Sequence, residues 1–280
     1  MDIRDKSGRD AGERVKSFQI IDKARLREQR GCLHRGLQAR LQQRFSHGFT
    51  LLSSFSFSKS IDDTSGVRTS SGVGELLTPS NNYNLKAERA RSAFDFTRRW
   101  TNSLLYELPF GKGKRFAGAS GRAADAVIGG WQVGTIFTLQ DGFPLSAFCG
   151  SGTFQNNDSG CYPDNVGVSP NLSRSQQDPS HFFNLAAFVN RLPGGEAFRY
   201  GNSGRNTVIG PGLIDWDFSV LKRFRFGERS NLEFRGEFFN IPNHPIFSNP
   251  GLSVGTLSYG VIGATVVDSR QIQFGLRLAF

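Results

Sequence analysis

Three cysteines and four histidines are the residues of this sequence with the most reactive side chains. Cys149 and Cys161 lie close together in the segment CGSGTFQNNDSGC, where an oxidising compartment would allow a disulfide that closes a short loop. The alternative is two free thiols. Cys32 has no partner in either case. Because no second pair of Cys or His residues has the spacing of metal ligands, we expect no metal site.

The histidines are scattered along the chain at His34, His47, His181 and His244. None of them belongs to a nucleophile motif such as G-x-S-x-G or to a zinc motif such as H-E-x-x-H. The segment GKGKRFAG at residues 111–118 lacks the spacing of a phosphate-binding loop and is typical of a solvated turn. We therefore predict no catalytic residue, no metal and no cofactor, and we do not expect an enzyme.

The composition is unusual for a water-soluble globular protein. Only 38% of the 280 residues are apolar, against about 45–50% in an ordinary domain, yet the chain contains 26 Phe and 33 Gly. Disordered chains are poor in aromatic residues, whereas this chain is 12% aromatic. Disorder can therefore describe only parts of the chain.

The net charge of +10 would suit a polyanion, such as nucleic acid, lipopolysaccharide or an acidic membrane surface. Nucleic-acid binding would require basic residues gathered on one face with exposed aromatic residues between them. Here the basic residues are spread along the chain, so we expect no nucleic-acid partner. No run of about 18 apolar residues is present, which argues against a membrane-spanning helix. The first 31 residues contain no apolar stretch typical of a signal peptide.

Apolar and polar residues alternate along seven segments of the chain. For example, Trp216 and Phe218 alternate with Asp217 and Ser219. Alternation with a period of two places successive side chains on opposite faces of a β-strand. We predict one strand in each of residues 36–45, 49–58, 99–110, 131–140, 214–226, 232–238 and 271–280.

The strands of a soluble antiparallel sandwich also alternate, so segment length has to separate the two classes. Most of these segments have about 10–13 residues, close to the roughly 9–11 that cross a bilayer at a tilt, whereas globular strands have about 5–6. The connections give a second criterion, because outer-membrane barrels have short periplasmic turns and long extracellular loops. If Phe280 is periplasmic, residues 61–93, 142–213 and 242–270 lie outside, and the turns at Ser46 and Gly227 lie inside.

The fold class predicted from these patterns is all-β: an antiparallel transmembrane β-barrel segment. It is incomplete, with about seven strands of a larger barrel. We divide the chain into residues 1–31, a polar segment in which we expect no strand and which is either disordered or a misassigned start, and residues 32–280, the barrel portion. Upstream strands would have to complete the barrel.

Several segments in order resemble the end of an Oar-like TonB-dependent receptor barrel, over nearly 90% of the chain. They are LQQRFSHGFTLLSSFSFSKSIDD, YELPFGKGKRF, IGGWQVGTIFTLQDGFPL, GNSGRNTVIGPGLIDWDFSVLKRFRF, FRGEFFNIPNHPIF and SRQIQFGLRLAF. The resemblance implies a parent protein with an amino-terminal domain, a plug inside a barrel of about 22 strands, and energy from the TonB system of the inner membrane. Contact with that system would be made only through parts that precede these segments.

Two further groups of residues are candidates for function in such a barrel. Charges on one face of the last strands would face the lumen, where they either tune the pore and hold a plug or pair across strands to keep the interior solvated. They are Asp217, Arg223, Arg225, Glu233, Arg235 and Glu237. The terminal Phe280, after alternating apolar residues, resembles the signal read by the outer-membrane assembly machinery. Deleting it should impair insertion.

The expected location is the cell outer membrane, and the expected partners are outer-membrane lipid and the assembly machinery. The expected function is that of a receptor or transporter barrel fragment whose parent performs TonB-dependent ligand uptake. The alternative is a structural or adhesive outer-membrane protein without transport, and the presence of a plug in the parent would separate the two.

Overall fold

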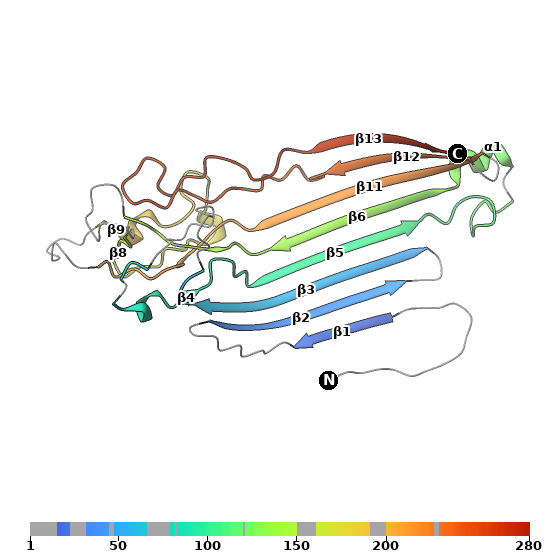
Figure 1. The fold of residues 1–280 in the computed structure, drawn as a ribbon. Helices are drawn as coiled ribbons and strands as arrows, with labels where there is room; N and C mark the ends of the chain where they lie inside the picture. The colour runs from blue at the N-terminus through green and yellow to red at the C-terminus, as the bar shows by residue number, and fades with distance from the viewer. Residues whose placement is uncertain are drawn as a thin grey trace.

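The computed structural model describes residues 16–22, 32–44, 48–65, 79–81, 83–119, 121–149, 161–190, 200–226 and 230–280. For residues 16–22, 122 and 225–226 only the backbone is described. Most of the chain forms one large antiparallel sheet (Figure 1). Its long strands are β1 (Lys16–Asp22), β2 (Leu33–Arg44), β3 (Phe49–Asp62), β5 (Arg98–Glu107), β6 (Trp131–Gln140), β11 (Leu213–Phe226), β12 (Ser230–Phe239) and β13 (Gln271–Ala279).

The long strands follow one another in the sheet in the same order as in the sequence. The order is β1-β2-β3-β5-β6-β11-β12-β13, and the short strand β4 (Ala90–Arg91) pairs with β3. The sheet is not closed, so β1 and β13 are its two edges (Figure 1). An all-β, antiparallel and incomplete barrel is confirmed, and each of the seven predicted strands is present.

The expectation of no strand before residue 32 is wrong. Strand β1 pairs antiparallel with β2 over its whole length, with Phe18 opposite Leu41 and Ile20 opposite Ala39. The segment KSFQIID alternates like the other strands but contains only two such apolar positions, so its signal is short. The division of the chain at residues 31 and 32 stays a prediction.

The register aligns apolar residues into one continuous face of the sheet. Phe55 lies opposite Trp100, Trp100 lies opposite Leu139, and Leu139 lies opposite Ile214. Residues directly opposite each other in neighbouring strands project from the same face. The apolar positions therefore form an apolar face across the sheet, and the alternating residues form a polar face.

The apolar face is not covered by the rest of the described chain. On β13, the side chains of Phe274 and Leu276 are 68% and 70% exposed. Among the described residues, no buried apolar side chain belongs to a long strand; those that are buried lie in the connections between strands. A soluble sheet buries its apolar face against another layer, so the open apolar face argues against a sandwich.

The two ends of the sheet differ in the length of their connections. At one end, residues 45–48 and 227–229 join strands directly, and residues 108–130 contain the helix α1 (Arg122–Ile128). At the other end lie three long connections, residues 63–97, 141–212 and 240–270 (left in Figure 1). We call their described residues the loop cap. The turn residues Ser46, His47 and Gly227 lie outside the described residues.

The loop cap contains the remaining small elements. They are the 3-10 helices η2 (Leu85–Glu88), η3 (Arg174–Gln176) and η4 (Leu185–Ala187) and the strands β7 (Pro144–Leu145), β8 (Asp164–Asn165), β9 (Phe188–Val189) and β10 (Val208–Ile209). Strand β7 pairs with β10, and β8 pairs with β9. Within the described part of the chain, no helix has the length and apolar character needed to span a membrane.

Candidate functional site

The loop cap has a hydrophobic core of its own. The core joins the second and third long connections, because Leu145 and Phe183 of the second pack in one cluster with Leu252 and Val254 of the third. Its buried members are Leu145, Ala147, Phe183, Ala187, Phe188, Val208, Leu252 and Val254. Fully burying such side chains contributes about 1.5–3 kcal/mol each. The cap is thus a packed unit and not a set of independent loops.

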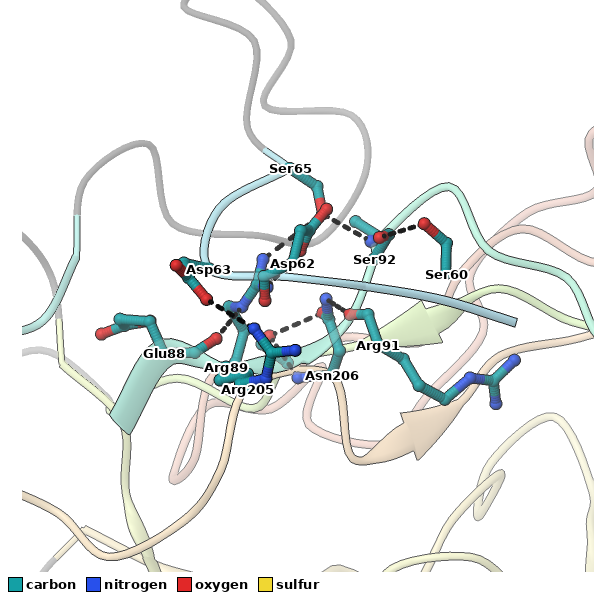
Figure 2. A network of polar contacts seen from close by, with 12 residues as sticks. Ser60, Asp62, Asp63, Ser65, Glu88, Arg89, Arg91, Ser92, Arg205 and Asn206 are labelled. Atoms are coloured by element: carbon teal, nitrogen blue, oxygen red, sulfur yellow. Dashed lines mark hydrogen bonds and ion pairs between the residues drawn. The ribbon is translucent and has the colours of Figure 1, made fainter. Parts of the chain in front are cut away.

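A buried ionic network joins the first and second long connections (Figure 2). Arg205 forms an ion pair with Asp62, the last residue of β3 at the end next to the loop cap. Both side chains are buried, with exposed fractions of 1% and 6%. Arg205 Nη2 also donates to the backbone carbonyl of Asp62 at 2.6 Å, and its Nε donates to the carbonyl of Glu88 at 2.9 Å. Removing one partner of a buried pair costs about 3–5 kcal/mol. Arg205 is therefore the main polar link of the cap to the sheet.

Neighbouring polar groups extend the network. The Asn206 backbone N–H donates to Ser146 Oγ at 2.9 Å. Asn206 Nδ2 donates to the carbonyl of Arg91 at 2.7 Å (Figure 2). Asp95 accepts from the Ser60 backbone N–H at 2.9 Å and from Arg91 Nε at 2.9 Å. These groups have partners within the protein, which fits a structural role better than a catalytic one.

Glu88 connects the network to the buried Tyr162. The Glu88 carboxylate accepts from the backbone N–H of Ser80 at 2.8 Å and from the Tyr162 hydroxyl at 3.2 Å. Burial, together with the nearby Glu88 carboxylate, raises the pKa of Tyr162 above its usual value. Tyr162 therefore remains a neutral hydrogen-bond donor to Glu88.

Cys149 and Cys161 form a disulfide in the second long connection, with their Cα atoms 5.4 Å apart. The backbone N–H of Cys149 also donates to the carbonyl of Cys161 at 3.0 Å. The bridge closes a short loop whose residues 150–160 lie outside the described residues. Cys32 is a free cysteine.

A hollow of about 1030 Å³ lies between the loop cap and the adjoining end of the sheet. Phe55, Trp100 and Leu139 line it from the apolar face, and Arg174 and Phe182 line it from the cap. Most of its sheet residues belong to the apolar face, but Gln140 of β6 and Leu213 of β11, which lie opposite each other on the polar face, also line it.

One of the predicted loop histidines, His244, lines this hollow, and His181 follows its lining residues Asp178 and Pro179 in the sequence. The backbone N–H of His244 donates to Asn240 Oδ1 at 3.0 Å. His181 follows the turn of Asp178, which accepts from the Ser180 hydroxyl at 2.7 Å. Hydrogen bonds from Ser180 lower the pKa of Asp178. Among the described residues, no three His, Cys, Asp or Glu side chains are grouped so that they could hold a metal ion.

The structure brings four of the six predicted lumen charges together on the polar face. Arg223 Nε lies 3.3 Å from Glu233 Oε2, Arg235 Nη2 lies 2.9 Å from Glu233 Oε1, and Arg235 Nη1 lies 3.7 Å from Glu237 Oε1. Glu237 also accepts from Gln273 Nε2 at 2.6 Å. The four charges thus alternate in sign across β11 and β12.

The other predicted residues stand apart from this group. Asp217 accepts from the backbone N–H of Asn240 at 3.0 Å. Arg225 belongs to β11, where it is paired with Asn231, but its side chain lies outside the described residues. Phe280 follows β13 at the end with short connections and is 96% exposed.

Two residues with extensive contacts in the structure, Arg205 and Lys222, are not among those predicted from the sequence. Arg205 could not be found, because its partner Asp62 is 143 residues away in the sequence. Lys222 had a signal, since it interrupts the apolar positions of β11 between Val220 and Phe224. A cation at an apolar position of a predicted membrane strand needs a polar partner.

Long amphipathic strands with an open apolar face and a charged polar face define the wall of an outer-membrane β-barrel. The sequence model of the family described as "outer membrane beta barrel domain" matches residues 21–273. The chain belongs to this family, and it is an outer-membrane protein. Comparison with curated proteins and with solved structures gave no significant match.

General rules for outer-membrane barrels relate the two faces and the two ends of such a sheet to the membrane. The apolar face is in contact with lipid and the polar face lines the interior. Because such barrels have long extracellular loops and short periplasmic turns, we expect the end with the long connections to be extracellular and the end with α1 to be periplasmic. The loop cap is therefore the part of the described chain that meets the outside.

Proposed function

We propose that this chain forms the C-terminal part of the wall of an Oar-like TonB-dependent receptor, whose parent takes up a ligand through a plugged lumen. The observation that carries the proposal is the charged cluster Arg223, Glu233, Arg235 and Glu237 on the interior face of an open sheet. Alternating charges on a lumen wall can bind a complementary folded plug.

The loop cap supports the same proposal from the outside. A disulfide, a buried ion pair and a hydrophobic core hold it in one conformation. A preorganised surface binds a ligand at lower entropic cost than mobile loops do. In this proposal, the cap contributes to ligand capture, the interior charges hold the plug, and energy reaches the plug from the TonB system through parts outside these residues.

The test is uptake in the native host. The gene is deleted, and accumulation is measured for radiolabelled ferric chelates, maltodextrins and short peptides, with and without a protonophore. We expect deletion to abolish the energy-dependent uptake of one of these probes. Unchanged uptake of every probe would contradict the proposal, and if the deletion then also reduced adhesion of the cells, the adhesive alternative would be favoured.

A pair of variants tests the interior charges. Arg235→Ala with Glu237→Ala should reduce uptake about tenfold, equivalent to about 1.4 kcal/mol, while the amount of inserted protein stays unchanged. Asn231→Ala, on the same face of β12, is the matched control, because it forms no ion pair among the described residues. Loss of insertion instead of uptake would show that the charges serve only cross-strand pairing.

A further inference from the structure

Lys222 is a buried cation on the lipid-facing side of the wall. It lies in β11 opposite Trp131 of β6 and Phe234 of β12, so it shares the apolar face with them. Lys222 is only 1% exposed to solvent. A charged side chain facing hydrocarbon is costly unless a polar partner covers it. The ammonium group of Lys222 therefore needs a polar partner within the protein.

The cover is the end of helix α1. Lys222 Nζ donates to the carbonyl of Gly129 and, at 3.2 Å, to the carbonyl of Val127. Carbonyls at the C-terminal end of a helix lack partners within the helix and carry partial negative charge. The rings of Trp131 and Phe224 lie 5.1 Å and 5.0 Å from the ammonium group, within the range of cation–π attraction.

These contacts place α1 on the lipid side of the wall. Trp131 Nε1 adds a further bond to the carbonyl of Val127 at 2.9 Å. The side chains of Val127 and Ile128 remain exposed. At the periplasmic end of a membrane strand, helix α1 would lie at the boundary between lipid headgroups and water.

The residues before α1 combine exposed aromatic rings with exposed cations. The rings of Phe110 and Phe116 lie 5.6 Å apart, and both side chains are exposed. The Arg115 guanidinium lies 5.5 Å from the Phe116 ring, and Lys112 and Lys114 are exposed beside it. We call the described residues from Phe110 to Ile128 the rim segment.

Acidic groups near the rim segment neutralise only part of this charge. Glu107 lies 3.2 Å from Lys114, and Asp125 accepts from the backbone N–H of Lys112. Among the described residues, the side chains of Lys112 and Arg115 have no ion pair. Two cations beside exposed aromatic and aliphatic side chains match a surface that carries phosphate above acyl chains.

We propose that the rim segment binds the phosphate headgroups of anionic phospholipid in the periplasmic leaflet, and that Lys222 holds it against the outer wall for this purpose. Lys112 and Arg115 contact phosphate, while Phe110, Phe116, Val127 and Ile128 enter the upper acyl region. The proposal depends on the outer-membrane location and not on the transport proposed above.

The test uses Trp131 as a reporter beside the rim segment. The chain contains three Trp, so Trp100→Phe with Trp216→Phe leaves only Trp131. The full chain is reconstituted in phosphatidylcholine nanodiscs that contain brominated phosphatidylglycerol or, at the same fraction, brominated phosphatidylcholine. We expect stronger quenching by the anionic lipid, with an affinity preference of at least about fivefold, the effect of roughly one basic residue at an anionic surface.

Charge reversal then identifies the residues. Lys112→Glu with Arg115→Glu should remove the preference, and Lys86→Glu with Arg174→Glu, an equal charge change on exposed residues of the loop cap, should retain it. Lys222→Met should reduce the preference and shift Trp131 emission to the red as α1 detaches, whereas Lys222→Arg should restore both. Two results would overturn the proposal. One is equal quenching by the two lipids in the chain that retains only Trp131. The other is an equal loss of the preference for anionic lipid in both charge-reversal variants.

Discussion

Arg205 shows how a single buried cation can organise a surface. Its guanidinium group contacts Asp62, the carbonyl of Glu88 and the hydroxyl of Ser65, which all belong to the connection that follows β3 or to its last residues. A buried charge has to be satisfied by several partners at once, because its desolvation is costly. Arg205 therefore fixes the position of residues 200–212 relative to the sheet.

Arg205→Met should destabilise the loop cap by about 3–5 kcal/mol, because Asp62 would be left as an uncompensated buried charge. The rate of thermolysin cleavage within the cap, measured in detergent, should rise strongly. Arg174→Met, at an exposed position of the cap, is the control and should leave the rate unchanged. Equal protection of the two variants would show that the ion pair does not hold the cap.

Gly142 shows a different constraint at the same end of the sheet. A Cβ atom at this position would lie 1.8 Å from the carbonyl oxygen of Gly210, which is backbone and cannot rotate away. Gly142→Ala should therefore push the backbone at residue 142 away from residues 210–211 and lower the free energy of unfolding by about 1–3 kcal/mol or more. Gly275→Ala is the control, since nothing lies within 4 Å of its Cβ position. Thermal unfolding followed by circular dichroism measures both, and an unchanged Gly142→Ala melting temperature would contradict the close approach.

At the scale of the strand, the two faces of β13 have opposite tolerances for charge. Phe274 lies on the apolar face opposite Gly236, whereas the adjacent Gln273 lies opposite Glu237 on the polar face. A charge on the lipid side of a barrel costs up to about 2–4 kcal/mol at the midplane, but lumen positions accept it.

Phe274→Arg should therefore reduce the fraction of inserted protein several-fold, while Gln273→Arg should insert normally and gain an ion pair with Glu237. Protease protection in outer-membrane fractions measures insertion. If both variants inserted equally, the assignment of the two faces would be wrong.

The strands could be predicted from the sequence because their signal is local. Alternation identified all seven long strands after residue 32, and the connection lengths matched the two ends of the sheet except at residues 108–130, which are long for the end with the short turns. β1 was missed because only Phe18 and Ile20 carry the alternation there. Helix α1 was not expected either, because RAADAVI is too short to show helical periodicity.

The loop cap could not be predicted, because its contacts join residues far apart in the sequence. Leu145 and Leu252 share a core, and Arg205 pairs with Asp62, yet neither pair follows from a local pattern. For the charged cluster on the polar face, the sequence predicted the residues and their shared face, but not which pairs form. Strand register decides that, and it depends on the whole ladder of backbone bonds.

At the scale of the molecule, the sheet has one end on each side of the membrane. Ser175 is exposed in the loop cap and Ala119 is exposed at the end with α1. In a Cys32→Ser background, Ser175→Cys should react with a membrane-impermeant maleimide in intact cells, whereas Ala119→Cys should react only after the outer membrane is permeabilised. The opposite pattern would reverse the orientation of the barrel.

The open sheet also bears on what the barrel can contain. Eight strands are enough to close a narrow cylinder whose own side chains fill its centre, yet these eight long strands leave both edges apart. A ring that combined these strands with further ones would have a greater circumference, and inward-pointing side chains alone would not fill its centre. Water or a folded segment would occupy the centre of such a ring, and the alternating cations and anions of β11 and β12 are the surface it would meet.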